Sequence, residues 1–452
     1  MLPPPDRVMF VVPEWMEHHC VIPDGFRKGA PFILYAEQLR YIGAMYTVRG
    51  DALWVPANPI LAPAFVRRRG LLVGPQKWGK NPLIAGQCCV EFVGPALFGG
   101  WAGIDEGYVC AEHGCRCGFE YPYDPGEPRG MAWPTPKIQI TAFSEDSTEN
   151  TYDALRPMIS QGPLADVLPK AGEDFIRHPN GAEDSRIDTV TSSNQSRLGA
   201  RSTFVPQDEL GLWTAQNKMV KLADTQYRNL AGMGGRASLT TNAWDPAEHS
   251  VAQREYESAA TDVYRQFDIP PKSLSFGDKR ERRRIFHIVY PADHLRENGG
   301  HVDLDAIEAE AADLVEKDAP QAERFFGNGL VVGAGAAIVP VRWEELYKAR
   351  EVPAGTYIGL GFDGSLSQDS TVLRACTADG HGFSLPGWSW VRPVGDAMAA
   401  WQVAHPGREW EVPRAEVEAA VATAFAVYRV GRMACDLAYW RDEITKWTQL
   451  YG

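Results

Sequence analysis

The sequence lacks long hydrophobic runs, a cleavable leader pattern and internal repeats. No stretch of about eighteen uncharged apolar residues occurs, so we expect no membrane span. The first residues, Met1 to Asp6, are rich in proline and show no basic region followed by an apolar stretch. No secretory signal is therefore expected. Repeat-built and low-complexity classes are disfavoured as well, because no period or biased tract is found.

Cysteine and positive charge are also scarce. Eight cysteines among 452 residues are too few for a disulfide framework, and a reducing compartment fits them. The adjacent Cys88 and Cys89 are expected to be small core residues. The net charge of −13 excludes a protein that is basic over its whole surface. The densest basic run, residues 279–284, could contact a phosphate backbone, although we favour a solvated surface or linker.

What the sequence does contain is enough apolar residue for large cores. Apolar residues make up 44% and aromatic residues 11% of the chain, and its length suggests two or three domains. Alternating strand and helix patterns to about residue 245 predict a parallel sheet flanked by helices. We predict a first domain over 1–270, a bracing linker over 271–354 with an acidic helix at 301–326, and a second domain over 355–452.

An apolar strand runs into a glycine-bounded loop at residues 71–81, with the spacing G-x-x-x-x-G-K. Gly74 permits a tight exit from the strand, and Gly79 lets backbone N–H groups approach phosphate oxygens. Lys80 then brings a positive charge to the β- and γ-phosphates at a helix N-terminus. The alternative is a glycine-rich turn before a helix. The predicted nucleotide-binding residues are Gly74, Pro75, Gln76, Lys77, Trp78, Gly79, Lys80 and Asn81.

Two further residues bear on this loop. Asn81 stands where such loops normally carry Ser or Thr, whose hydroxyl ligates Mg²⁺, and its amide oxygen could take that place. We predict that residues 82–93 form the helix after the loop. Gln38, in a helix predicted over 29–40, could read an adenine edge through paired hydrogen bonds. It could equally be a polar residue on a solvated helix face.

An acidic pair follows a short strand predicted over 203–207. Asp208 would hold Mg²⁺, and Glu209 would polarise the attacking water. Pro206 is unusual for a central strand, and an Asp-Glu pair is also common on surfaces. The strand at 237–242 ends in polar residues, where a γ-phosphate sensor would sit. An ordinary turn is the alternative for that strand end.

Two aspartates in the last hundred residues each follow an apolar strand. Asp363 ends the strand that starts at Tyr357, and Asp436 follows the strand that starts at Val430. If these strands are neighbours, the two carboxylates could share Mg²⁺ or Mn²⁺ ions. Two such ions about 4 Å apart stabilise the attacking and leaving oxygens of a phosphodiester. Each aspartate alone could instead be a turn former or a helix cap.

Four potential zinc ligands lie within eight residues: Cys110, His113, Cys115 and Cys117. Zinc sites usually separate their two ligand pairs widely, so one loop would have difficulty supplying all four ligands. A zinc-held loop and an irregular loop with free thiols both remain open.

The order of these features resembles the large subunit of a tailed-bacteriophage terminase. The resemblance rests on Gln38, the loop 74–81, the segment 138–150, the Asp208–Glu209 pair, the strand end 240–242 and the two strand-terminal aspartates. It implies a P-loop ATPase of the additional-strand type, followed by a ribonuclease-H-like nuclease. By resemblance, Lys80 contacts nucleotide phosphates, Asp208 serves Mg²⁺, Glu209 is the catalytic carboxylate, and Asp363 and Asp436 are nuclease metal ligands.

The same resemblance implies ATP-driven packaging of double-stranded DNA into a prohead and endonuclease cutting of concatemeric DNA. It also implies a portal protein, a small terminase subunit and a homo-oligomeric ring as partners, in the cytoplasm of an infected bacterium. The family's nuclease uses a third acidic residue, and this chain stops at Gly452, so we expect a truncated or incomplete nuclease. Nearby acids are Asp369, Asp442 and Glu443, and candidates for an arginine finger are Arg67, Arg68 and Arg69.

Two other functions remain open at this point. The chain could be an ATPase motor whose second half lacks nuclease activity. It could also be a nucleotide-binding assembly protein that uses a zinc-held Cys/His loop for interaction.

Overall fold

The computed structural model describes residues 7–55, 64–143, 145–168, 172, 175–190, 201–333, 350–367, 370–393 and 395–452. The chain divides into two compact units, Met1–Trp343 and Glu344–Gly452. Each unit has hydrophobic cores of its own.

A seven-stranded sheet forms the centre of the first unit, in the order β11-β1-β10-β9-β6-β8-β7. All neighbouring pairs are parallel except β7 and β8, which form an antiparallel hairpin. The strands are β1 (Arg69–Val73), β6 (Lys137–Thr141), β7 (Phe175–Arg177), β8 (Arg186–Val190), β9 (Phe204–Gln207), β10 (Arg236–Thr241) and β11 (Val263–Phe267). The predicted parallel sheet is confirmed.

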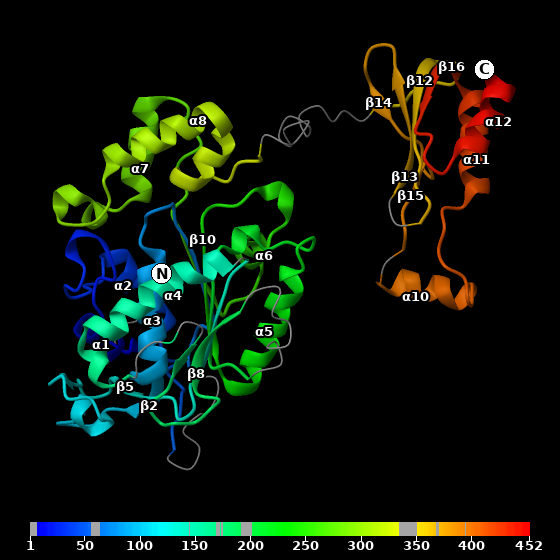
Figure 1. Cartoon of the computed structure of the whole chain (residues 1–452). Helices are drawn as coiled ribbons and strands as arrows, with labels where there is room; N and C mark the ends of the chain where they lie inside the picture. The colour runs from blue at the N-terminus through cyan, green and yellow to red at the C-terminus, as the bar shows by residue number, and fades with distance from the viewer. Residues whose placement is uncertain are drawn as a thin grey trace. The chain divides into compact units, whose positions relative to one another are not determined.

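Helices cover both faces of this sheet (Figure 1). Strand β1 is apolar on both sides, as a buried parallel strand should be. Leu72 packs in the core with helices α1 to α4, whereas Leu71 and Val73 pack in the core with α5 and α6. The helices are α1 (Val11–His19), α2 (Ala36–Met45), α3 (Lys80–Val93), α4 (Glu145–Gln161), α5 (Met219–Met233) and α6 (Val251–Glu257).

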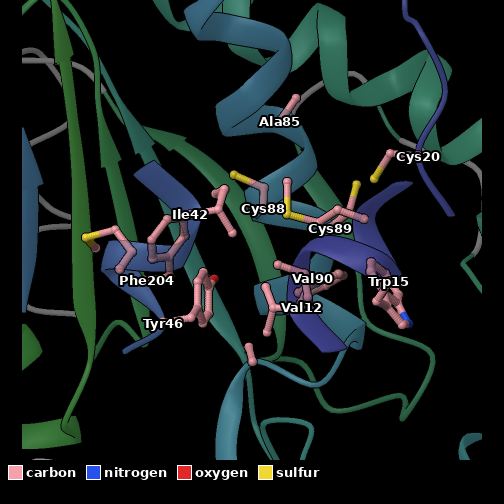
Figure 2. Close-up of a cluster of buried hydrophobic side chains, with 14 of the residues drawn as sticks. Val12, Trp15, Cys20, Ile42, Tyr46, Ala85, Cys88, Cys89, Val90 and Phe204 are labelled. Atoms are coloured by element: carbon pink, nitrogen blue, oxygen red, sulfur yellow. The ribbon is translucent and has the colours of Figure 1, made fainter. Parts of the chain in front are cut away.

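Figure 2 shows part of the larger core, where α1, α2 and α3 meet. Cys88 and Cys89 of α3 are fully buried there with Trp15 and Ile42. Both cysteines are free, and they act as small apolar side chains, as predicted. Helix α3, which follows the loop 74–79, is therefore held by packing along most of its length.

Smaller elements surround this centre. Two short antiparallel pairs join β2 (Leu97–Trp101) to β5 (Pro128–Met131) and β3 (Gly107–Val109) to β4 (Glu120–Pro122). Helices α7 (Lys279–Val289) and α8 (Leu304–Phe326) pack on each other around a third core. Helix α8 contains a break at Asp318, two residues before Pro320, as expected where proline removes a helical hydrogen bond. The basic run 279–284 forms the first part of α7. Arg282 of this run is buried and pairs with Glu308 of α8.

The second unit contains a mostly antiparallel sheet in the order β14-β13-β12-β16, with β15 paired to β13. Strand β12 alternates buried and exposed residues, because α11 and α12 cover one face of the sheet only (Figure 1). Strand β16 runs parallel to β12. The elements are β12 (Tyr357–Asp363), β13 (Thr371–Thr377), β14 (Gly382–Phe383), β15 (Ser389–Trp390), α10 (Gly395–Ala404), α11 (Arg414–Val427), β16 (Arg429–Cys435) and α12 (Arg441–Tyr451).

One local prediction needs correction, and one predicted strand is confirmed in spite of a proline within it. The helix predicted over 29–40 begins only at Ala36, because the Tyr35 backbone N–H is capped by the Gln38 side chain and the preceding residues are not helical. Pro206 does lie inside a central strand, paired in register with Ser238.

Within the described residues, no helix has the length and apolar character needed to cross a membrane.

Candidate functional sites

The loop 74–79 connects the carboxyl end of β1 to the first residue of α3. Gly79 has a φ of +94°, which an L-residue with a side chain adopts only with strain. Lys77 also has a positive φ of +64°. The loop is anchored to β10, because the Gly74 N–H donates to the Thr241 carbonyl at 3.1 Å. This turn places Lys80 at the helix N-terminus, as the glycine spacing predicted.

Lys80 is held by three oxygen acceptors. Its Nζ donates to the Gly74 carbonyl at 2.6 Å, to the Pro75 carbonyl at 2.9 Å and to the Asn242 Oδ1 at 2.9 Å. Burial lowers the pKa of Lys80 to about 8, while Asp208 and Glu209 act in the opposite direction. The ammonium therefore lies in the field of both acidic residues.

The acidic pair lies at the same edge of the sheet. Strand β10 separates β1 from β9, so the polar end of β10 lies between Lys80 and the acids. The Asp208 carboxylate accepts a hydrogen bond from the Thr240 hydroxyl at 2.7 Å and one from the Glu209 N–H at 2.9 Å. Burial raises the pKa of Asp208 above its usual value, and the bond from Thr240 partly offsets this. Glu209 follows with a left-handed backbone, φ +57°.

The region 290–326 contacts the outer side of the loop. The Tyr290 hydroxyl donates to the Gln76 carbonyl at 2.8 Å, and the Gln76 N–H donates to the Phe325 carbonyl at 2.7 Å. The Nε2 of His301 lies 2.8 Å from the Lys77 carbonyl. These contacts tie α8 and the segment before it to the loop 74–79.

Trp78 and Gln38 complete the surroundings of the loop. Trp78 is buried, with its ring centre 4.8 Å from that of His294. Gln38 is buried too: its Oε1 accepts the Tyr35 N–H at 3.1 Å, and its Nε2 lies 3.5 Å from the Gly79 carbonyl. It is therefore not on a solvated face. Asn81 is half-buried in the first turn of α3.

The three arginines considered for an arginine finger lie at the amino end of β1, the opposite end from the loop. Arg67 donates to the Thr261 carbonyl, and Arg68 pairs with Asp262. Arg69 pairs with Glu255 at 2.9 Å. These contacts brace the start of β1 against the segment around β11.

In the second unit, Asp363 and Asp436 lie at the same end of two neighbouring strands. Phe362 of β12 is paired with Cys435 of β16, and the Asp436 N–H donates to the Phe362 carbonyl at 3.0 Å. Each aspartate is the next residue after this pair, and both are exposed. Parallel strands present their carboxyl ends at one edge, so the register brings the two residues to adjacent backbone positions.

The three acids named as candidates for a third metal ligand lie in different surroundings. Glu443 pairs with Arg414, which also donates to the Tyr439 carbonyl at 3.0 Å. Asp442 is exposed in the first turn of α12. Asp369 lies outside the described residues.

The cysteine-rich loop forms a four-residue cluster that differs from the predicted set. The ligand atoms of Cys110, Cys115, Cys117 and His19 all lie within 4.8 Å of one another. His113 instead stacks on Tyr108, with ring centres 4.6 Å apart and an interplanar angle of 10°. The structure thus replaces His113 by His19, because the short turn directs His113 away while the end of α1 brings His19 in. Burial lowers the pKa of His19 to about 4.

Comparison with known proteins shows which solved structures have a similar fold. The crystal structure of the HK97 bacteriophage large terminase matches 97% of this chain and 82% of its own chain, with a TM-score of 0.52 and 17% identity. The chain has the large-terminase fold. In the first unit, β10 lies between β1, which precedes the loop 74–79, and β9, which precedes the Asp208–Glu209 pair. The ribonuclease-H-like expectation for the second unit is consistent with its sheet order.

Curated relatives come from phages as well. The chain is 26% identical over 429 residues to the Gene 13 protein of Mycobacterium phage L5, covering 86% of this chain and 65% of that protein. It is 25% identical over 423 residues to the Gene 13 protein of Mycobacterium phage D29, with 86% and 64% coverage. The chain therefore spans about two thirds of the length of these relatives. No protein-family model matches it.

Sequence reasoning missed several residues that surround the sites of this large-terminase fold. His19 lies ninety-one residues before Cys110, so no local spacing pointed to it. Tyr290 and His301 contact the loop 74–79 from a region that was predicted to be a linker. By contrast, Asn242 and Thr240 belong to the strand end that the sequence analysis singled out, and they contact Lys80 and Asp208.

Proposed function

We propose that this chain is a phage DNA-packaging motor that hydrolyses ATP and carries a metal-dependent DNA endonuclease. The observation that carries the proposal is the meeting of Lys80, Asn242 and Asp208 at one edge of a parallel sheet. A strand-to-helix loop with a lysine, a central polar strand end and a buried carboxylate is the arrangement that nucleotide hydrolysis needs.

In the proposed nucleotide site, the triphosphate lies along the loop 74–81. Lys80 exchanges its loop carbonyl acceptors for phosphate oxygens, while Asn242 positions the ammonium and senses the γ-phosphate. Glu209 accepts a proton from the attacking water as general base. Gln38 is proposed as an adenine contact. In that role its hydrogen bonds to Tyr35 and Gly79 would be replaced by hydrogen bonds to the base.

The oxygen donors near the loop fit a magnesium ion. The Asp208 carboxylate and the Asn81 amide oxygen are hard ligands, and Mg²⁺ commonly takes one or two protein ligands together with phosphates and water. When bound, Mg²⁺ supplies positive charge beside the β- and γ-phosphate oxygens. Thr240 orients the Asp208 carboxylate through its hydroxyl, and it is proposed as a positioning residue.

In the proposed nuclease site, Asp363 and Asp436 hold divalent ions at the edge formed by β12 and β16. Both side chains are exposed and offer carboxylate oxygens, which suit Mg²⁺ or Mn²⁺. When bound, such ions supply Lewis-acid charge to the phosphodiester oxygens. Double-stranded DNA is the proposed substrate, and a portal protein, a small terminase subunit and further copies of the chain in a ring are the proposed partners. The proposed location is the cytoplasm of the infected bacterium.

ATP turnover by the whole chain tests the motor. We expect Lys80→Ala to abolish binding of the triphosphate and Glu209→Gln to lower turnover about 100-fold or more, since a positioned base typically contributes at least that factor. Glu209→Gln should leave ATP binding nearly intact, because it removes a group that acts on water.

The matched control is Lys221→Ala, which removes an exposed lysine on α5. This variant should retain wild-type turnover. ATP hydrolysis that survives Lys80→Ala would contradict the motor in every form.

A further inference from the structure

We infer that His19, Cys110, Cys115 and Cys117 bind a structural zinc ion. Three ligands come from the turn between β3 and β4, and the fourth is the last residue of α1. One loop would have difficulty supplying four zinc ligands, but here the loop supplies only three and α1 supplies the fourth. This site is separate from the nucleotide and nuclease sites and does not depend on the proposed function.

The spacing of the ligand atoms suits a tetrahedral ion. The His19 Nε2 lies 3.1 Å from the Cys117 Sγ, 3.3 Å from the Cys110 Sγ and 3.7 Å from the Cys115 Sγ. In a tetrahedral zinc site with ordinary bond lengths, a nitrogen and a sulfur ligand lie about 3.6 Å apart and two sulfurs about 3.8 Å apart. Small shifts of the side chains therefore complete the coordination shell.

The imidazole is already oriented for this role. Its Nδ1 lies 2.8 Å from the Trp15 carbonyl, which can only accept a hydrogen bond. The proton therefore sits on Nδ1, and the lone pair of Nε2 points at the three sulfurs. The ring also stacks on Trp15, with centres 4.1 Å apart. Zinc-binding histidines commonly have such an outer partner, which fixes the tautomer and the ring plane.

The turn that carries the cysteines is built to converge them. The Cys110 N–H donates to the Phe119 carbonyl at 3.0 Å, and the Cys115 N–H donates to the Cys110 carbonyl at 3.1 Å. Gly114 and Gly118 have φ values of +82° and +80°, which glycine adopts at little cost. These bends turn the chain back twice within a few residues and direct all three thiols to one side.

The chemistry of the donors selects zinc and a structural role. Three thiolates and one imidazole form a soft, closed set that leaves no position for water or substrate, as in structural zinc sites. Cys110 and Cys115 are buried, and Cys117 is half-buried. All three are free thiols in the structure, and a disulfide would join only two of them and leave the third beside His19.

The ion would connect two parts of the first unit that are distant in sequence. Helix α1 packs against α3, the helix that starts at Lys80. A zinc ion at the end of α1 therefore fastens the β3–β4 turn to the layer that supports the phosphate-binding loop. Because metal binding free energy is folding free energy in such sites, removing zinc should lower the stability of this unit.

Metal content of the purified whole chain tests the inference. After exposure to zinc and removal of loose metal, we expect about one zinc per chain in the wild type. Cys117→Ser and His19→Ala should lose most of it, whereas His113→Ala should keep it. His113 is the matched control, because it lies in the same turn but stacks on Tyr108.

Three measurements keep the test valid if a variant fails to fold. His19→Cys keeps four soft ligands, so it should retain zinc. Cobalt in the wild type should show thiolate charge-transfer and tetrahedral ligand-field bands, which shift in His19→Cys. A chelator should lower the melting temperature of the wild type and of His113→Ala alike.

Three results would overturn the inference: much less than one zinc per reconstituted wild-type chain, zinc loss in His113→Ala with retention in soluble His19→Ala, or a disulfide within the cluster of the chain purified from a reducing cytoplasm.

Discussion

Lys80 carries its charge in a half-buried position between loop carbonyls and two acidic residues, and its protonation should control nucleotide binding. Its pKa is lowered to about 8, mainly by burial. Below that pH the ammonium attracts phosphate oxygens, and above it the neutral amine does not. Bound phosphates favour the charged form, so binding above this pH takes up a proton.

We therefore predict that ATP affinity falls as the pH rises above about 8, with a limiting slope of about tenfold per pH unit. The dissociation constant of a fluorescent ATP analogue from about pH 7.5 to pH 9.5 measures this, and calorimetry in buffers of different ionisation enthalpy counts the proton. Lys80→Arg keeps its charge throughout this range and should show no such fall. A dissociation constant that stays unchanged over this pH range in the wild type would contradict control of binding by the protonation of Lys80.

At the scale of elements, a buried polar network joins α3 to β10. Arg236, the first residue of β10, pairs with Glu91 in the last turn of α3 at 2.5 Å, and both are almost fully buried. Glu91 also accepts bonds from the Tyr46 hydroxyl at 2.6 Å and the Trp133 ring N–H at 3.0 Å. The network thus holds in place the two elements whose other ends carry Lys80 and Asn242.

Glu91→Gln keeps the size of the side chain but leaves the Arg236 guanidinium buried without its counter-charge. We predict that it destabilises the first unit by about 3–5 kcal/mol, the usual cost of breaking one partner of a buried pair. Thermal and urea unfolding of the whole chain, followed at the transition of the first unit, measure this. Asp313→Asn, at an exposed pair with Lys317 on α8, should leave the transition almost unchanged.

Predictions from sequence succeeded where one element carries its own signal. Glycine spacing located the loop before α3, and the helix expected after that loop was placed at 82–93, close to its observed range of Lys80–Val93. The helix at 29–40 began too early, because a capping interaction between Gln38 and Tyr35 fixes its start. Periodicity reports which face is buried, but it does not report where a side chain caps the backbone.

Contacts between distant segments could not be predicted in the same way. Nothing in the spacing of the cysteine-rich turn indicates that His19 completes it, since sequence gives no distance across ninety-one residues. His113 is closer in sequence and of the right type, yet the turn directs it onto Tyr108. Pro206 shows the opposite case, because a residue that argues against a central strand is accommodated in one.

At the scale of the whole molecule, the two units should be separable in function. Each contains its own sheet and core, and substitutions that share no partners usually act independently. We predict that Asp363→Asn removes the Mn²⁺-dependent cutting of plasmid DNA but leaves ATP turnover unchanged. Lys80→Ala should do the reverse when cutting is measured without ATP.

The predicted loss of DNA cutting depends on where Asp363 lies, so removing another exposed carboxylate should not cause it. Asp379 follows β13 at the other end of the second sheet, where it pairs with Arg350, so Asp379→Asn is the matched control and should cut DNA normally. Because Asp363 and Asp436 are exposed at one strand edge, Asp436→Asn should reproduce the loss seen for Asp363→Asn. Normal cutting by Asp363→Asn would show that β12 does not supply a metal ligand. An intact chain that turns over ATP but never cuts DNA would instead favour a motor without nuclease activity.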